Sequence, residues 1–355
     1  MRIPWRWVAL TVPTSLIVAC GDQPSAPTPA QTAALPAARP ALVAAGRKFR
    51  VTDLGTLGGA TSYAEAINDA GWVVGVSDLS QAGASHAFLW KNGRMMDLGT
   101  LGGSSSTALG INDAGEISGS SALAGDSVWH AFRWSGGRMV DLGGLGGAYA
   151  EGFAINDAGD VTGYAAGPGS GHAALWRHGA VTDLGTLGGS LSWSNGINNS
   201  DVVVGGATVA GDVSQPAFVW KRGVMTSIGT LGGSFGGASH INDAGWVVGG
   251  SATAGDAATH AFLWHGGPMR DLGALSGDYS YAQGINDAGQ VVGVSCLADG
   301  ACHGVLWYNG ALTDLGIFPG GSDGSWAQAI NNRGQIVGNA KSATGQDHAA
   351  LWAAP

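Results

Sequence analysis

Residues 63–99 read YAEAINDAGWVVGVSDLSQAGASHAFLWKNGRMMDLG, and the rest of the chain repeats this pattern. Three markers recur about every 44 residues. The asparagine of an Ile-Asn pair stands at Asn68, Asn112, Asn156, Asn198, Asn242, Asn286 and Asn331. A tryptophan closes another segment at Trp90, Trp134, Trp176, Trp220, Trp264, Trp307 and Trp352. Asp-Leu-Gly begins at Asp53, Asp97, Asp141, Asp183, Asp271 and Asp314, with Ser227 in the remaining place. The agreement of the three markers indicates seven structural repeats.

Within each repeat, apolar and polar residues alternate with a period of two, which is typical of β-strands. Residues 63–67 and 73–77 form two short strands, joined by an Asn-Asp-Ala-Gly turn that suits a tight reversal. Residues 86–90 form the third strand, and an Asn-Gly hairpin leads to the fourth at residues 94–99. A single four-stranded sheet cannot bury both of its faces, so neighbouring repeats must pack together.

The two ends of the repeat region indicate how the repeats are arranged. The region starts with an unpaired fourth strand at residues 49–55 and ends with an unpaired third strand at residues 348–352. If the first completes the last sheet, no sheet lacks a strand and no edge is exposed. The sequence therefore predicts an all-β fold, a seven-bladed β-propeller closed by its N-terminal strand, with an open β-solenoid as the alternative.

The strand order also assigns the loops to two faces. The Thr-Leu-Gly-Gly connectors between sheets, such as residues 56–59, lie on the same face as the variable loops between second and third strands. We call this the connector face, and we call the opposite side, with the Asn-Asp-Ala-Gly turns, the turn face. Variable loops on a fixed scaffold are where binding is usually built.

The His-Ala-Phe segments that begin at His86, His130 and His260, each followed by Asp-Leu-Gly, resemble the HAF-repeat family of extracellular bacterial proteins. The resemblance covers nearly all of residues 48–352. Pro216 replaces the histidine of the fourth unit, Ser227 replaces an aspartate in the fifth, and two connectors vary near Leu275 and Phe318. The resemblance implies an exported repeat protein and supplies no reaction.

The N-terminus has the features of an export signal. Arg2 and Arg6 precede a short apolar stretch that ends at Ala19-Cys20, which resembles the lipobox of bacterial lipoproteins. We expect a signal peptide at residues 1–19, a lipidated Cys20 heading a Pro- and Ala-rich tether at residues 20–47, and the propeller at residues 48–355. This predicts a cell-envelope protein, periplasmic or surface-exposed, held on the membrane by its lipid. An ordinary secretory signal is the alternative.

Charge argues against nucleic acid as a partner. The chain has 16 Lys and Arg against 25 Asp and Glu, a formal charge of −9. Loss of Arg2 and Arg6 would make it still more acidic, which disfavours binding to a phosphate backbone.

Histidine recurs at the start of the third strand, and each such histidine stands near an Asp-Leu-Gly aspartate at the same end of the adjacent strand. Metal ligands must converge on one ion, whereas these residues lie one blade apart, so we expect structural hydrogen bonds and no metal or other cofactor. The predicted pairs are His86–Asp97, His130–Asp141, His172–Asp183, His260–Asp271 and His303–Asp314, and His348 continues the series.

Departures from the repeat are better guides to binding. Four residues before the isoleucine of the first strand, four of seven repeats carry an aromatic residue. These are Tyr63, Trp193, Tyr281 and Trp326. At the connector-face end of the innermost strands their rings would stack on a flat ligand such as a sugar, or else wedge adjacent blades together. His240 replaces the small residue of the other repeats and would fill a gap or line the central opening.

Cys296 and Cys302 stand at the two ends of the sixth variable loop. An exported protein matures in an oxidising compartment, so we expect a disulfide between them.

These observations favour a lipid-anchored, non-enzymatic binding or scaffold module that recognises a glycan, peptide or protein on the connector face. One alternative is an extracellular propeller hydrolase or lyase acting on polysaccharide, since fold does not fix function. The other is a purely structural surface protein.

Overall fold

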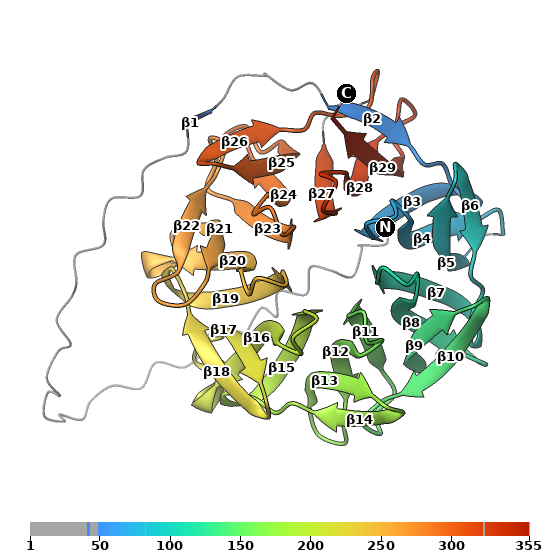
Figure 1. Ribbon diagram of the computed structural model, residues 1–355, viewed down its shortest axis with the longest axis horizontal. Helices are drawn as coiled ribbons and strands as arrows, with labels where there is room; N and C mark the ends of the chain where they lie inside the picture. Colours follow the sequence, from blue (N-terminus) through green and yellow to red (C-terminus); the bar gives the residue numbers. More distant parts are fainter. Residues whose placement is uncertain (1–40, 43–48, 82, 322–323, 355) are drawn as a thin grey trace, which may run out of the picture. The chain divides into compact units, whose positions relative to one another are not determined.

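The computed structural model describes residues 41–42, 49–81, 83–321 and 324–354. Strands dominate, and the two short helical segments are 3₁₀ turns, η1 (Ala210–Asp212) and η2 (Ala254–Asp256). Seven antiparallel sheets stand around a central axis as the blades of a propeller (Figure 1). None of the helical segments in these ranges is long and apolar enough to span a membrane.

Three blades form the first part of the ring, each with its innermost strand first in sequence. Blade 1 contains β3 (Gly58–Ile67), β4 (Val73–Leu79), β5 (Ser85–Lys91) and β6 (Arg94–Asp97). Blade 2 contains β7 (Gly102–Ile111), β8 (Ile117–Leu123), β9 (Trp129–Ser135) and β10 (Arg138–Gly143). Blade 3 contains β11 (Ala150–Ile155), β12 (Val161–Ala166), β13 (Gly171–Arg177) and β14 (Ala180–Asp183).

Four further blades complete it. Blade 4 contains β15 (Gly188–Ile197), β16 (Val203–Val209), β17 (Ala217–Lys221) and β18 (Val224–Gly229). Blade 5 contains β19 (Gly232–Ile241), β20 (Val247–Thr253), β21 (Thr259–Trp264) and β22 (Arg270–Gly273). Blade 6 contains β23 (Ser280–Ile285), β24 (Val291–Cys296), β25 (Cys302–Tyr308) and β26 (Ala311–Asp314). Blade 7 contains β27 (Ser325–Ile330), β28 (Ile336–Lys341), β29 (Asp347–Ala353) and β2 (Arg50–Asp53).

Blade 7 joins the two ends of the repeat region. β2 pairs antiparallel with β29, with Val51 opposite Trp352 and Asp53 opposite Ala350, and the two strands lie side by side in Figure 1. The predicted propeller, closed by its N-terminal strand, is therefore confirmed. The open solenoid is excluded because no blade lacks its outer strand.

One short pairing was not expected. β1 (Ala41–Leu42) runs parallel to β26 and adds a fifth strand to the outer edge of blade 6. These two residues belong to the stretch that the sequence presents as a tether. Their composition gave no sign of pairing, because a two-residue strand is too short to show an alternation.

The hydrophobic core lies between neighbouring blades. Val74 and Leu89 of blade 1 form one buried cluster with Ile117 and Phe132 of blade 2, and similar clusters follow around the ring. Each blade thus buries its faces against the next, as a propeller requires.

The third strand fills this core in one of two ways. In blades 1, 2, 4 and 5 a phenylalanine is fully buried and the tryptophan two residues later is only partly buried, as for Phe88 and Trp90. Blades 3, 6 and 7 have a smaller residue in the phenylalanine position, and there the tryptophan is at most 4% exposed. These pairs are Ala174 with Trp176, Val305 with Trp307, and Ala350 with Trp352.

The innermost strand also has two forms. It spans ten residues in blades 1, 2, 4 and 5, where the sequence indicated a shorter strand, and six residues in blades 3, 6 and 7. The long form follows a connector with threonine. The Thr56 hydroxyl donates to the carbonyl of Gly59 and accepts from the Gly58 amide, which folds the connector so that pairing begins early. Gly144, Ala274 and Ile317 take the place of this threonine before the short strands.

Candidate functional site

The histidines of the third strands contact aspartates of the fourth strands. His86 Nδ1 lies 2.8 Å from Asp97 Oδ1, and the same pairing recurs at 2.6–2.9 Å in every blade that has both residues. The last pair, His348–Asp53, joins the two ends of the repeat region. The aspartate also accepts a hydrogen bond from the glycine amide two residues later, as Asp97 does from Gly99. Each pair therefore fixes the outer edge of its blade and the start of the next connector.

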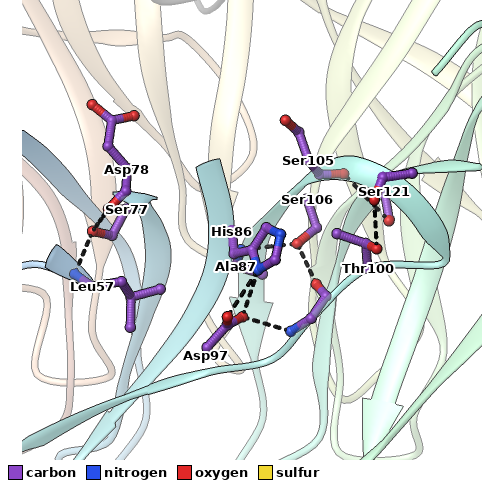
Figure 2. Close-up of polar contacts among 12 residues, drawn as sticks. Leu57, Ser77, Asp78, His86, Ala87, Asp97, Thr100, Ser105, Ser106 and Ser121 are labelled. Atoms are coloured by element: carbon purple, nitrogen blue, oxygen red, sulfur yellow. Dashed lines mark hydrogen bonds and ion pairs between the residues drawn. The ribbon is translucent and has the colours of Figure 1, made fainter. Parts of the chain in front are cut away.

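A buried serine continues this network into the next blade (Figure 2). Ser106 on β7 donates to the carbonyl of Gly99 and accepts from the amide of Ala87, which follows His86. Equivalent contacts from the third strand to the next blade reach Ser192, Ser280, Ser325 and Ser62. These bonds satisfy buried backbone groups and hold adjacent blades in register.

Blade 4 shows that histidine and aspartate are lost together. Pro216 occupies the histidine position and Ser227 the aspartate position, and β17 and β18 bring the two substitutions into one blade. Ser227 Oγ still accepts a hydrogen bond from the backbone amide of Gly229. The serine keeps the aspartate's role in the connector, and the histidine is absent where its partner is absent.

On the turn face, the seven Ile-Asn asparagines form a closed ring of hydrogen bonds. Each side-chain amide donates to the backbone carbonyl of the next asparagine around the ring, as Asn68 does to Asn112, and Asn331 returns to Asn68. The side-chain oxygen accepts the amide four residues later, as Asn68 does from Trp72. All seven asparagines are at most 5% exposed. The buried side-chain amides thus join neighbouring blades through their nitrogens and hold their own turns through their oxygens.

The next residue of each turn forms a second ring. Its side-chain oxygen accepts the backbone amide of the preceding blade's equivalent residue, at 2.8–3.3 Å throughout. Five members are aspartates and two are asparagines: Asp69, Asp113, Asp157, Asn199, Asp243, Asp287 and Asn332. Asn199 donates to the carboxylates on both sides, and so does Asn332. The two asparagines therefore divide five like charges that would repel one another.

The rings surround a central cavity of about 170 Å³ on the turn face, which the innermost isoleucines and His240 also line. His240 is partly buried, and its Nδ1 atom has no hydrogen-bond partner among the described residues. Burial lowers the pKa of His240 below its usual 6.5, and the carboxylates of Asp287 and Asp243 oppose that shift. Burial therefore disfavours the charged form of the imidazole, although the side chain lies at the edge of an acidic ring.

The four aromatic residues are all partly buried. The Tyr63 hydroxyl donates to Asp347 of blade 7, and the Tyr281 hydroxyl donates to the Gly237 carbonyl of blade 5. A Cβ at Gly250 would lie 2.1 Å from the Tyr281 ring, so that glycine makes room for the ring on the neighbouring blade.

The two tryptophans contact their own blades. Trp193 covers Gly206, the residue opposite it on β16, and Trp326 lies against Gly324. The tyrosines thus contact neighbouring blades, as the wedge interpretation expects, whereas Gly206 and Gly324 belong to the same blades as Trp193 and Trp326. None of the four lines the central cavity.

The predicted disulfide is confirmed. Cys296 and Cys302 are bonded to each other and close the sixth variable loop. Within the described ranges, no group of three or more His, Cys, Asp or Glu residues is arranged to hold a metal ion. The predicted signal peptide, the lipidated Cys20 and most of the tether lie outside the described residues.

Sequence reasoning missed two features of the site. The two rings arise because turns of successive repeats meet at one axis, whereas the recurrence of Ile-Asn in the sequence indicates only a turn in each repeat. Ser170 lies 3.0 Å from His172 Nε2 but belongs to a variable loop, so it left no periodic signal. A comparison of the residue two positions before each histidine would have singled it out.

No protein-family model matches the chain, and no curated protein matches it. Solved structures show the same kind of fold. The β-propeller domain of the Trilobed protease from Pyrococcus furiosus is 11% identical with a TM-score of 0.55, and the match covers 82% of this chain and 93% of that one. That propeller is described as having an open velcro topology, whereas here β2 closes the ring.

TolB from Acinetobacter baumannii is 14% identical with a TM-score of 0.47. The match covers 79% of this chain and 63% of TolB, so this chain spans less than two thirds of the TolB structure. At these identities, the similarity to the Pyrococcus furiosus domain shows the β-propeller fold and nothing about activity.

Proposed function

We propose that this protein is an exported HAF-repeat propeller that acts as a binding or scaffold module, with its ligand site on the connector face. The observation that carries this proposal is the difference between the two faces. On the turn face every blade contributes one residue to each of the same two rings of hydrogen bonds. On the connector face the loops between second and third strands differ.

Those loops are built in several ways. In blades 2, 4 and 5 an aspartate side chain of the loop accepts a hydrogen bond from a backbone amide of the innermost strand, as Asp126 does from Ser104. Blade 6 has the Cys296–Cys302 disulfide instead. Blade 3 has a tight turn in which the Gly167 amide donates to the backbone carbonyl of Ser170. A uniform scaffold with individual loops on one face favours recognition of a glycan, peptide or protein there.

Trp193 and Trp326 are the aromatic residues best suited to stack on such a ligand. The Trp193 ring packs on Gly206 of the adjacent strand and the Trp326 ring on Gly324 just before its own strand, so both glycine contacts lie within one blade. We expect the double variant Trp193→Ala/Trp326→Ala to lose binding on glycan and peptide arrays by a factor of ten or more, since truncating a central aromatic anchor costs about 2 kcal/mol or more.

The turn face supplies the matched control. Trp246 is 37% exposed and stacks on His265 with ring centroids 4.4 Å apart, on the side away from the connectors. Trp246→Ala should bind like the wild type. Equal binding by all three proteins would contradict a connector-face site, and no binding to any array by the wild type would favour a purely structural protein.

We further propose that the protein reaches the cell envelope as a lipoprotein anchored through Cys20. Two or three acyl chains bind a membrane durably, because each buried methylene contributes about 0.8 kcal/mol. Cys20→Ser should therefore move the protein from the membrane fraction to the soluble fraction. Its retention in the membrane fraction would contradict lipid anchoring and leave the binding test unaffected.

A further inference from the structure

Blade 3 differs from the other blades in the surroundings of its histidine. His172 Nδ1 lies 2.8 Å from Asp183 Oδ2, as in the other pairs. Its second ring nitrogen, Nε2, lies 3.0 Å from the hydroxyl oxygen of Ser170. In the other blades with a histidine pair, the residue two positions before the histidine has no hydroxyl: these are Ala84, Val128, Ala258, Ala301 and Gln346. Among the residues that the structure describes, a Ser–His–Asp chain of contacts therefore occurs once.

The aspartate decides the direction of these hydrogen bonds. An ionised carboxylate only accepts, so the neutral imidazole of His172 carries its proton on Nδ1 and donates it to Asp183. Nε2 then has a free lone pair and accepts a hydrogen bond from the hydroxyl of Ser170. This is the arrangement in which a histidine acts as general base toward a serine hydroxyl while the aspartate fixes its tautomer.

The serine stands where a substrate can reach it. Ser170 is exposed in the loop before β13, and a cavity of about 250 Å³ is lined by Leu145, the loop of residues 167–170, His172 and Asp183. A Cβ on Gly169 would meet no atom within 4 Å, so the loop leaves the approach open. The amides of Gly169 and Ser170 make no hydrogen bond within the described part of the chain, so they are available to an oxyanion.

We infer that Ser170, His172 and Asp183 form a hydrolytic site for short, uncharged acyl esters. The size and lining of the cavity set the substrate class. The cavity has no lysine or arginine in its lining, so a phosphate or carboxylate substrate would find no counter-charge, and Leu145 and Pro168 offer an apolar wall for a small acyl group. Esters suit the site better than amides because an alkoxide is the easier leaving group and Asp183 is 46% exposed, which weakens its support of the imidazolium.

The reaction proceeds in two balanced steps. Ser170 Oγ attacks the ester carbonyl as its proton passes to His172 Nε2, and the bond to the alkoxy oxygen then breaks as that proton moves to the departing alcohol. A water molecule next attacks the acyl-serine and gives a proton to Nε2. The bond from the acyl carbon to Ser170 breaks, Oγ recovers the proton, and a carboxylic acid leaves. This inference goes beyond the proposed binding function, which requires no reaction.

A test uses the full chain with a fluorophosphonate probe, which labels activated serines, and with p-nitrophenyl acetate as substrate. We expect mass spectrometry to find the label on Ser170. We expect Ser170→Ala to abolish the label, and His172→Gln to slow both labelling and ester hydrolysis by about 100-fold, the usual contribution of a general base. Asp183→Asn should slow them as well, because an asparagine amide does not hold the required tautomer.

Two control variants separate this chemistry from the structural role of the pairs. His130→Gln breaks the equivalent pair of blade 2, which has no serine partner, and Ser85→Ala removes the serine at the start of β5 whose hydroxyl donates to Asp78. Both should label and hydrolyse like the wild type. The inference is overturned if the native wild type shows no label on Ser170, or if folded Ser170→Ala or His172→Gln, checked by circular dichroism, retains full activity. Either result leaves the array-binding test of the proposed function untouched.

Discussion

Asp113 occupies the least favourable place in the acidic ring of the turn face. Its neighbours around the ring are Asp157 and Asp69, whereas each other aspartate has an asparagine on one side. Asn199 shows that an asparagine here can donate to the carboxylates on both sides. An asparagine in place of Asp113 could therefore bond to both neighbouring carboxylates and would remove one negative charge from the ring.

Asp113→Asn should therefore stabilise the protein. We expect its melting temperature to rise by about 1–3 °C at low salt, the scale of an exposed charge contact in a chain of this size. The gain should shrink in about 1 M NaCl, because salt screens the repulsion that the substitution removes. Asn199→Asp is the converse control and should lower the melting temperature; a rise for that variant, or no rise for Asp113→Asn, would contradict the repulsion argument.

His240 should make the stability of the protein depend on pH. Its pKa in the folded state lies below the ordinary 6.5, so its contribution is fully present above pH 6.5 and is lost as pH falls toward the lowered value. The equivalent position holds alanine in three of the other blades and glycine in the remaining three, so His240→Ala introduces a residue that the position accepts. Urea unfolding of both proteins between pH 5 and 8 should show a shallower acid loss in the variant. Parallel curves would show that His240 titrates normally.

The His260–Asp271 pair acts in the opposite direction. The hydrogen bond to Asp271 raises the pKa of His260 although burial lowers it, so this pair stabilises most below pH 6.5 and its contribution disappears as pH rises through the raised value. In the same titrations His260→Gln should cost more stability at pH 6 than at pH 8. A cost that does not vary with pH would indicate that the ordinary hydrogen bond, and not the charge, matters.

At the level of elements, the third strand explains how blades of different sequence keep one thickness. Where the core position is Phe88, Trp90 stays partly exposed, and where it is Ala350, Trp352 is fully buried. Both side chains point to the same face because they are two residues apart on a strand. Either the phenylalanine or the tryptophan of the third strand therefore fills the space between two blades.

This exchange predicts that the core has no room for both. Ala350→Phe should destabilise the protein by about 1–3 kcal/mol in urea unfolding, the usual cost of overpacking, because Trp352 already fills the space. Adding Trp352→Leu should recover part of the loss in a double-mutant cycle. Additive effects of the two substitutions would mean that the side chains do not compete.

The features of the fold and of the candidate site that the sequence predicts are mostly those that recur in every repeat. The seven blades, the β2–β29 closure and the Cys296–Cys302 bridge follow from markers that recur or from a pair with one evident partner. The two strand lengths were visible in principle, since Thr56 and its equivalents precede the long strands, but the effect of a threonine hydroxyl on a connector has no periodicity. The contacts of Tyr281 with Gly250 join different blades, so they require the arrangement in space.

On the scale of the whole molecule, the ring is closed by noncovalent contacts alone. The four strands of each other blade are consecutive in sequence, with β1 added outside those of blade 6, but blade 7 depends on the four residues of β2 and on the His348–Asp53 pair, whose members are 295 residues apart. The Asn331 amide and the Ser62 hydroxyl also bridge the first and last blades near the axis. Opening this junction exposes two blade faces at once, so we expect unfolding to begin there.

A matched pair of substitutions tests that expectation. Asp53→Asn and Asp97→Asn break the same contact in the same geometry, one across the closure and the other within blade 1. Both should lower the free energy of unfolding by a similar amount, about 1 kcal/mol for a largely solvent-accessible charged hydrogen bond. Only Asp53→Asn should speed unfolding by the full amount, because contacts that break before the transition state appear in the unfolding rate. Equal unfolding rates for the two variants would place the first opening elsewhere in the ring.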